Sequence, residues 1–408
     1  MKLLPQLVIT SIFARCMKLS FDNTEIAFQH KNKGALRKAY TLFKMLGSSL
    51  FVSIGKGLLN LALFLHFPIK WAVKPTIFAQ FCGGETIAEC ASTTKILDDR
   101  NVGTILDYSV EGKEDEEDLD STCEEIKRTV QTAHNNPHIP FCVFKVTGVA
   151  RLGLLEKVNE KKQLTESEVR EFERVKERVE SICKLAASTG TPVFIDAEES
   201  WMQDAIDGLA QEMMMRYNTS ACIVYTTAQL YRHDRFEFIK SSAAEARERG
   251  YFFGIKLVRG AYMEKERDRA EDLGYTSPIQ PTKADTDRDF NNALRFCVQN
   301  LDVVSICAGT HNEESSMLLA ELIEQSKVER NDARVYFAQL FGMSDHISFN
   351  LSDAGYNVAK YVPYGPIREV MPYLIRRADE NTSVKGQTGR ELNLILKELH
   401  RRKGVSLG

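Results

Sequence analysis

Eight short apolar runs follow one another between residues 104 and 362, and they constrain the fold more than any other feature of the chain. Most of them are rich in Val, Ile, Phe or Tyr, and few alternate strictly between apolar and polar residues. Continuous apolar runs are typical of strands that are buried on both faces of a parallel sheet. The runs lie at 104–109, 140–147, 192–197, 220–226, 253–258, 303–308, 334–340 and 357–362.

Helix-compatible stretches separate these runs, and the alternation of strand and helix indicates an α/β protein. A doubly wound open sheet alternates in the same way. Eight nearly evenly spaced units favour a closed barrel instead, because a (βα)8 barrel needs about 250 residues and the runs span a similar length. We therefore predict a (βα)8 TIM-like barrel at 96–400. Its clearest helical stretches are 165–188, 200–216, 234–249, 286–299 and 313–326.

The first 95 residues contain no strong strand signal, and we expect an N-terminal helical region there. The opening MKLLPQLVITSIFARCMKL only weakly resembles a targeting peptide, because it shows no small-residue cleavage site. We assign no targeting peptide, and Met17 is an alternative start of the chain.

Residues 50–67 come nearest to a membrane span, but Lys56 and two glycines interrupt the apolar run. We expect a core or interfacial helix rather than a span. Because lysines flank the run, peripheral contact with anionic lipid is a further expectation. These flanking residues are Lys44, Lys70 and Lys74.

Charge and cysteine usage exclude several classes of protein. With 53 basic and 56 acidic residues the net charge is −3, which excludes a globally basic nucleic-acid binder. The nine cysteines form no C-x-x-C pair, so a zinc ribbon, a redox dithiol and a full disulfide framework are not indicated. We expect buried, unreactive thiols in a reducing compartment, and thus a cytoplasmic protein.

Polar residues stand at the ends of six of the eight apolar runs. In a (βα)8 barrel the chemistry gathers where the strands end and the βα loops begin. Lys145 and Lys256 lie inside their runs, where an unpaired ammonium group would be costly. The polar positions are Lys145, Asp196, Gln229, Lys256, Arg259, Thr310–His311–Asn312 and Tyr361.

The segment 366–381, PIREVMPYLIRRADEN, predicts a helix that carries an anion site. Gly365 and Pro366 mark its expected start, and Pro372 should kink it. Two adjacent guanidinium groups beside a phenol form a fork for a carboxylate or a phosphate. The alternative is a solvated basic face that pairs with Asp379 and Glu380. The residues at i, i+3, i+4 and i+7 of one face are Tyr373, Arg376, Arg377 and Glu380.

Several cofactor and nucleophile motifs are absent from the chain. It contains no G-x-G-x-x-G, no G-x-x-x-x-G-K-[ST], no H-E-x-x-H and no G-x-S-x-G. A cofactor must therefore be held in another way.

Two stretches together resemble the proline dehydrogenase (proline oxidase) family: KLVRGAYM at 256–263 and YVPYGPIREVMPYLIRRADEN at 361–381. Five shorter motifs match the same family in barrel order, so the resemblance covers about residues 20–395. These motifs are LDYSVEG, FKVTG, FIDAEES, GTHN and QLFGM. The motif GPIREVMPYL at 365–374 resembles the monofunctional eukaryotic-type branch of the family. The family implies a distorted (βα)8 barrel that binds FAD, with a C-terminal helix over the active site.

The resemblance also implies roles for individual residues. Lys145, Arg376 and Arg377 are implied to hold the carboxylate of L-proline. Asp196 and Lys256 are the implied catalytic residues beside the flavin, and no metal is implied. The implied ring pocket is lined by Tyr262, Leu340, Tyr361 and Tyr373. The implied FAD contacts are Ala197, Gln229, Val258, Arg259, Gly260, Ala261, Thr310, His311, Asn312, Glu380 and Ser383.

The implied activity is oxidation of L-proline to Δ1-pyrroline-5-carboxylate, the first step of proline catabolism to glutamate, by hydride transfer from the δ-carbon to the flavin. A membrane quinone is the implied electron acceptor, which would place the chain peripherally at an inner membrane, mitochondrial if it is eukaryotic. Hydroxyproline dehydrogenase is the nearest alternative, and Tyr361 argues against it because its phenol would crowd a ring hydroxyl. A metal-dependent hydrolase that uses Asp196 and His311, and a barrel without enzymatic activity, are more distant alternatives.

Overall fold

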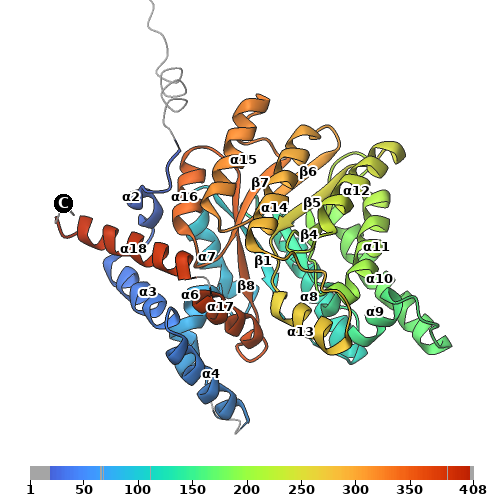
Figure 1. Cartoon of the computed structure of the whole chain (residues 1–408), viewed down its shortest axis with the longest axis horizontal. Coiled ribbons are helices and arrows are strands. Elements are labelled where there is room, and N and C mark those ends of the chain that lie inside the picture. Colours follow the sequence, from blue (N-terminus) through green and yellow to red (C-terminus); the bar gives the residue numbers. More distant parts are fainter. Residues whose placement is uncertain (1–18, 65–66, 68, 111, 384, 405–408) are drawn as a thin grey trace, which may run out of the picture.

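Eight parallel strands close into a barrel in the order of the chain, with β8 paired to β1 (Figure 1). The computed structural model describes residues 19–404 except 65, 66, 68, 111 and 384. The prediction of a (βα)8 TIM-like barrel is therefore confirmed. The strands are β1 (Val102–Tyr108), β2 (Phe141–Phe144), β3 (Val193–Ile195), β4 (Val224–Gln229), β5 (Phe253–Val258), β6 (Val304–Gly309), β7 (Val335–Leu340) and β8 (Val358–Tyr364).

Helices surround the barrel, and local sequence signals set their ends. Thr165 and Glu168 form a capping box at the start of α10, and Gly190, with φ +67°, ends this helix. Asn312 caps α15 by accepting a hydrogen bond from the amide of Ser315. The surrounding helices are α8 (Glu116–His134), α9 (Leu152–Asn159), α10 (Glu166–Thr189), α11 (Ser200–Tyr217), α12 (Arg235–Arg249), α13 (Met263–Leu273), α14 (Lys283–Gln299), α15 (Glu313–Ser326) and α16 (Asp345–Asp353).

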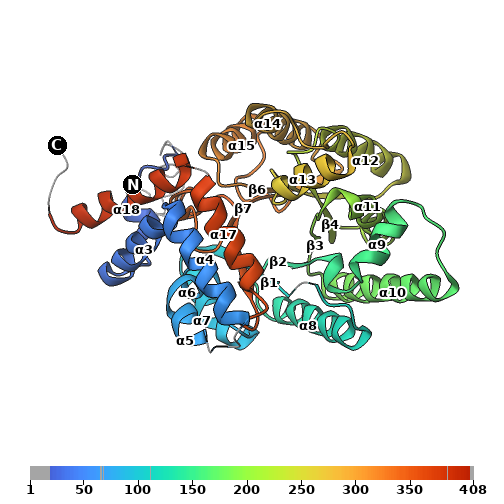
Figure 2. The same cartoon turned by 60° about the horizontal axis from the view of Figure 1, so that its bottom comes forward.

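Helices precede the barrel and lie beside the last two helices, α17 (Met371–Ser383) and α18 (Lys385–Arg401) (Figure 2). Phe43, Phe81 and Leu374 belong to a second apolar core between these groups, separate from the barrel core. The backbone amide of Gly83 donates to the carbonyl of Pro363, which ties this region to β8. The helices are α2 (Thr24–Phe28), α3 (Lys33–Leu46), α4 (Ser49–Phe64), α5 (Lys70–Val73), η1 (Lys74–Phe78), α6 (Ala79–Phe81) and α7 (Ile87–Asp98).

The apolar run at 50–67 largely forms α4, which packs against α3 and α17. Leu50, Phe51 and Ile54 expose more than half of their side-chain surface. No helix within the described ranges combines the length and the apolar character that crossing a bilayer requires. The weakly targeting-like stretch and Met17 lie outside the described residues.

Side chains fill the interior of the barrel. The rings of Phe141 and Phe194 stack with their centroids 4.5 Å apart, and Tyr225 meets both rings edge-on. Tyr361 stacks on the open side of Phe194, at 6.2 Å. This aromatic layer fills the barrel interior below Tyr361, and in barrels of this kind ligands bind at the carboxyl ends of the strands.

The predicted fourth strand, at 220–226, was placed too early, because β4 begins at Val224. The reason is Asn218, whose side-chain oxygen accepts from the amides of Ile223 and Val224. Its amide group donates to the carbonyls of Val224 and Phe252. One buried side chain therefore satisfies backbone groups that a strand ladder would otherwise pair.

The predicted start of the C-terminal helix was also wrong. Residues 367–370 form a turn, and α17 begins at Met371. Pro372 therefore lies in the first helical turn, where a missing amide hydrogen costs nothing, and the expected kink has no cause.

Candidate active site

The predicted site residues gather at one rim of the barrel. Because all eight strands are parallel, their carboxyl ends and the following loops face the same side. Leu340 of β7 pairs in register with Tyr361 of β8. The remaining rim residues are Lys145 after β2, Asp196 and Ala197 after β3, Gln229 ending β4, Val258 ending β5, Arg259–Tyr262 after β5, and Thr310–Asn312 after β6.

Lys256 is the central cation of this rim, and it is only 4% exposed. Its ammonium group contacts the carboxylate of Asp196 and donates to the hydroxyl of Tyr361. The nitrogen lies 4.5 Å from the ring centroid of Tyr361 and 5.3 Å from that of Phe194. The opposite charge and the two rings together offset the cost of burying the ammonium group.

Burial, together with the charge of Asp196, raises the pKa of Tyr361 well above its ordinary value. The phenol therefore stays protonated and offers a neutral polar edge beside the ammonium group. The ammonium group of Lys256 thus lies between the carboxylate of Asp196 and the neutral hydroxyl of Tyr361, just inside the barrel.

Helix α17 brings Tyr373, Arg376 and Arg377 to one face, as their spacing predicts. The guanidinium carbon of Arg377 lies 5.1 Å from the ring centroid of Tyr373, and that of Arg376 lies 6.0 Å from the ring of Tyr262. The buried hydroxyl of Tyr373 has no hydrogen-bond partner among the described residues. A buried phenol without a partner is available to a polar group of a ligand.

The alternative interpretation of this helix was that its arginines pair with Asp379 and Glu380, and the structure shows one of these pairs. Arg377 binds Glu380 at 2.6 Å, so one guanidinium group of the fork already has an acidic neighbour. Asp379 instead binds Lys56 of α4 at 2.8 Å. Ser383 closes α17, and its side chain lies outside the described residues.

Lys145 directly precedes a single 3-10 turn, η2 (Val146–Gly148). A buried carboxylate, that of Glu198, accepts from both the amide and the hydroxyl of Thr147 in this turn. Burial raises the pKa of Glu198 to about 7, against the opposing effects of Thr147 and of the charge of Lys145. The loop after β3 therefore holds the loop that carries Lys145.

The side chain of Gln229, at the end of β4, joins the loop after β3 to the loop after β5. Its nitrogen donates to the carbonyl of Glu198 at 2.7 Å, and its oxygen accepts from the amide of Ala261 at 3.2 Å. Gly260 has φ +137°, and a Cβ atom there would lie 2.5 Å from the ring of Tyr231. Glycine at this position is thus required both by the backbone conformation and by the aromatic ring.

Arg259 joins the loop after β5 to the loop after β6. It binds Asp287 at 2.7 Å and donates to the hydroxyls of Thr310 (2.7 Å) and Ser315 (3.0 Å). Its guanidinium group also lies over the ring of Phe290, and burial lowers its pKa. Each of the three guanidinium nitrogens thus makes one hydrogen bond within the protein, and these bonds use three of the five N–H groups.

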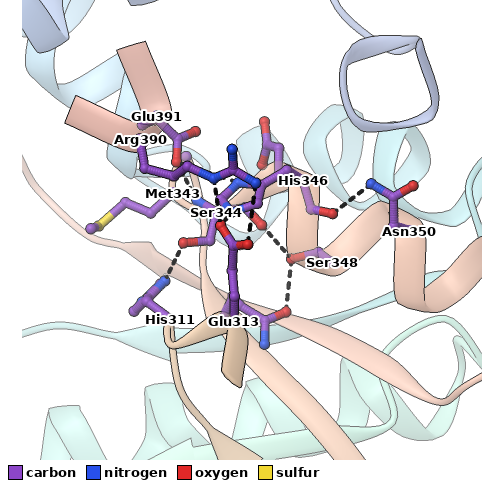
Figure 3. Close-up of polar contacts among 12 residues, drawn as sticks. His311, Glu313, Met343, Ser344, His346, Ser348, Asn350, Arg390 and Glu391 are labelled. Carbon is purple, nitrogen blue, oxygen red and sulfur yellow. Dashed lines mark hydrogen bonds and ion pairs between the residues drawn. The ribbon is translucent and has the colours of Figure 1, made fainter. Parts of the chain in front are cut away.

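His311 follows Thr310, and its Nδ1 forms a hydrogen bond of 2.9 Å with the hydroxyl of Ser344 (Figure 3). Burial and nearby cations lower the pKa of His311 to about 3, so the imidazole is neutral at ordinary pH. Asn312 uses its side-chain oxygen to cap α15. The three residues after β6 are thus each held by a separate contact.

Comparison with known proteins decides the family to which this rim belongs. The family model described as "Proline dehydrogenase" matches residues 90–390, which include the whole barrel. The chain belongs to the proline dehydrogenase family. In this family the chain is 32% identical to "Proline dehydrogenase 1, mitochondrial" of Dictyostelium discoideum, over 94% of the chain and 75% of that protein.

Two further relatives show how the similarity is distributed. Proline dehydrogenase 1, mitochondrial, of Homo sapiens is 39% identical over 59% of this chain and 40% of its own length. The carbapenem antibiotics biosynthesis protein CarD of Pectobacterium carotovorum is 33% identical over 79% of this chain and 83% of that protein. The chain thus spans less than half of the human relative but most of CarD.

A solved structure confirms the fold of this proline dehydrogenase family member. Proline utilization A (PutA) from Bdellovibrio bacteriovorus, inactivated by N-propargylglycine, superposes with a TM-score of 0.70 at 19% identity. The match covers 98% of this chain and 43% of that one. At this identity the likeness establishes the fold alone.

The ligand set for the alternative of a metal-dependent hydrolase does not assemble. Asp196 contacts Lys256 and His311 binds Ser344, so the two residues proposed for a metal have different partners. Within the described part of the chain, no group of three or more His, Cys, Asp or Glu residues is arranged to hold a metal ion.

Two buried residues near the site carry no role in the sequence prediction. Glu198 was within reach of sequence reasoning, because it lies in FIDAEES directly after the third apolar run. Ser344 gave no such signal, because its contact with His311 joins loops that are 33 positions apart.

Proposed function

We propose that this chain oxidises L-proline to Δ1-pyrroline-5-carboxylate with FAD as its cofactor. The observation that carries the proposal is the joint placement, at one rim, of the Lys256–Asp196–Tyr361 cluster and the arginines of α17. Membership of the proline dehydrogenase family, and relatives that are named for this activity, support the same conclusion.

The donors at the rim fit a flavin nucleotide. Such a group combines a polar ring, a hydroxylated chain and a diphosphate, which need neutral donors and cations together. The rim supplies the amide of Gln229, the guanidinium group of Arg259, the ammonium group of Lys256 and the backbone from Val258 to Ala261. Bound FAD would supply the hydride acceptor. Ala197, Thr310, His311, Asn312, Glu380 and Ser383 complete the set that we assign to it.

Cations and aromatic rings provide the substrate pocket in this proposal. Lys145, Arg376 and Arg377 bind the carboxylate, because guanidinium groups form strong charge-assisted hydrogen bonds with carboxylates. Tyr262, Leu340, Tyr361 and Tyr373 surround the pyrrolidine ring. The aromatic layer below Tyr361 keeps the substrate at the rim and excludes water from beneath it. Binding in one orientation removes much of the entropic barrier to the reaction.

The rim favours proline over a hydroxylated ring. Tyr361 is 7% exposed; its ring stacks on Phe194 and its hydroxyl accepts from Lys256. A ring hydroxyl that meets this phenol would have to displace it. Hydroxyproline is therefore the second candidate substrate, disfavoured by the position of one side chain.

We assign the electron acceptor to a membrane quinone, reached through peripheral contact with anionic lipid. The support is the exposed apolar set Leu50, Phe51 and Ile54 on α4, near exposed lysines such as Lys44 of α3. Under this proposal the chain acts at an inner membrane from the cytoplasmic side, or in the mitochondrion for a eukaryotic source. Several relatives carry mitochondrial in their names.

One absorption spectrum tests the central proposal. The purified protein should show the visible bands of oxidised flavin, and anaerobic L-proline should bleach them. Trans-4-hydroxyproline should bleach them much more slowly. A colourless protein that cannot be reconstituted with FAD, or a bound flavin that proline leaves oxidised, would contradict the proposal.

A further inference from the structure

Two adjacent residues of α18, Arg390 and Glu391, reach the start of α15 and the loop that follows β7, respectively (Figure 3). Together with His311, Glu313, Ser344 and His346 they form a connected set of polar contacts, which we call the α18 network. Ser344, His346 and Glu391 are buried, whereas Arg390 and Glu313 are partly exposed. The roles assigned above use only His311 from this set, so the buried members need a reason for being connected to it.

Ser344 is the centre of the α18 network. It is completely buried and has φ +51°, a left-handed conformation that is uncommon for a residue other than glycine. Its amide donates to Oε2 of Glu391 at 3.1 Å, and its hydroxyl forms the 2.9 Å hydrogen bond with Nδ1 of His311. A strained residue persists only where its surroundings determine it, and here Glu391 supplies that restraint.

A second arm of the network fixes α18 on both sides of this contact. Arg390 binds the carboxylate of Glu313 through Nε at 2.8 Å, and His346 binds the same carboxylate through Nε2 at 3.0 Å. His346 also places its Nδ1 3.8 Å from Glu391. The contact of Arg390 with Glu313 anchors this turn of α18 to the start of α15 and so keeps the neighbouring Glu391 beside Ser344.

The consequence falls on the ring of His311. Its Nδ1 is occupied by Ser344, and no described residue forms a hydrogen bond with its Nε2. A partner on one ring nitrogen sets the orientation of an imidazole, and a serine hydroxyl can serve either tautomer because it can donate or accept. The other nitrogen is then presented to whatever binds at the rim.

We propose that Ser344 and Glu391 are positioning residues, which hold the imidazole of His311 in the one orientation that binds the flavin. This inference rests on the proposed function, because it takes FAD as the ligand of His311. The contacts run from Glu391 of α18 through the left-handed Ser344 to the ring of His311. In this way α18 contributes to the proposed cofactor site indirectly.

The first experiment measures the dissociation constant of FAD from the apoprotein, by quenching of flavin fluorescence. Ser344→Ala and Glu391→Gln should each weaken binding roughly three- to tenfold, the loss expected for one hydrogen bond. The double variant should be no weaker than the worse single variant, because both changes act on one contact path. Equal affinity in all variants, or fully additive losses, would overturn the inference.

Two matched controls separate positioning from general loss of stability. Ser352→Ala removes a buried hydroxyl from α16, the helix that begins directly after Ser344, and the partners of this hydroxyl are the carbonyls of Arg100 and Asn101. Glu398→Gln removes a buried carboxylate from the same helix, α18, which pairs with Arg401 and Arg402. Both controls should lower the melting temperature and leave FAD affinity within about twofold.

A second measurement does not depend on the flavin. The chain has eight histidines, and in 15N-histidine-labelled apoprotein the ring signals of His311 can be assigned with a His311→Asn variant. Ser344→Ala should change the tautomer or the mobility that these signals report, whereas Ser352→Ala should not. Unchanged His311 signals would overturn the positioning role. Failure of the wild type to bind FAD would instead contradict the proposed function.

Discussion

Lys256 of β5 and Tyr361 of β8 meet inside the barrel, although 105 positions separate them in the chain. The ammonium group donates to the phenol and also contacts Asp196. A buried cation therefore joins two strands that are not neighbours in the sheet. In the proposed enzyme this cluster forms the floor on which the flavin and the substrate meet.

The arginines of α17 give the first prediction. Arg376→Met and Arg377→Met should each raise the KM for proline about 30-fold or more, since breaking a desolvated charge pair costs about 2–5 kcal/mol. FAD should remain bound. Arg368→Met is the matched control, because Arg368 is exposed in the turn before α17 and should leave the KM unchanged. An unchanged KM in both test variants would remove the carboxylate assignment.

Tyr361 gives a prediction about specificity. Tyr361→Ser should lower kcat/KM for proline, because pocket contacts worth about 1–3 kcal/mol are lost. For trans-4-hydroxyproline kcat/KM should fall less or rise, because the serine leaves room for the ring hydroxyl. Tyr361→Phe keeps the ring and should keep the preference for proline, while it loses the bond to Lys256. Dye-reduction assays with both substrates measure the ratio of the two kcat/KM values. If Tyr361→Ser lowers kcat/KM equally for both substrates, Tyr361 does not select proline over hydroxyproline.

Glu198 should make stability depend on pH. Its pKa is about 7 in the folded protein, above the ordinary 4.5, so folding favours the protonated form. The protonated carboxyl group thus adds about 3 kcal/mol to the free energy of unfolding. This stabilisation is fully present below about pH 4.5 and is lost as the pH rises through about 7. The free energy of unfolding in urea should therefore fall between about pH 5 and about pH 8. This fall should be larger in the wild type than in Glu198→Gln.

A control for this prediction is the adjacent carboxylate. Glu199 pairs with Lys265 at 2.8 Å, and Glu199→Gln should keep the pH dependence of the wild type. If Glu198→Gln shows the same fall between the two pH values as the wild type, the carboxyl group of Glu198 does not titrate in this range.

Gly260 should tolerate no side chain. Gly260→Ala places a Cβ atom 2.5 Å from the ring of Tyr231, whereas Gly274→Ala, at φ +69°, meets nothing within 4 Å. Both variants bear the cost of a positive φ, which is larger at +137° than in the left-handed region at +69°, and only the first is also overpacked. The free energy of unfolding should therefore fall by about 1–3 kcal/mol more for Gly260→Ala than for Gly274→Ala. Equal losses in urea unfolding would show that Tyr231 moves aside freely.

The exposed face of α4 predicts lipid binding. The protein should co-sediment with vesicles that contain phosphatidylserine more than with phosphatidylcholine vesicles, and high salt should weaken the binding. Leu50→Ser together with Phe51→Ser should reduce it at either salt concentration, because these side chains expose 65% and 58% of their surface. Negligible binding to both kinds of vesicle would contradict the peripheral-membrane proposal.

The sequence by itself determined the architecture and much of the proposed site. The eight apolar runs predict the barrel because strands buried on both faces cannot alternate, and parallel closure then brings every strand end to one rim. The spacing of Tyr373, Arg376 and Arg377 likewise sets their common face, because it depends only on the period of a helix. Such features follow from local periodicity, which any stretch of chain carries within itself.

Only the tertiary structure decided how far each element extends and which partners its side chains meet. The side-chain hydrogen bonds of Asn218 delay β4 against the local signal, and the turn at 367–370 moves the start of α17 to Met371. The contacts from Ser344 to Glu391 and to His311 span 47 and 33 positions. No pattern in the sequence marks these pairs, since closure of the barrel and docking of α18 against it create the distances at which they interact.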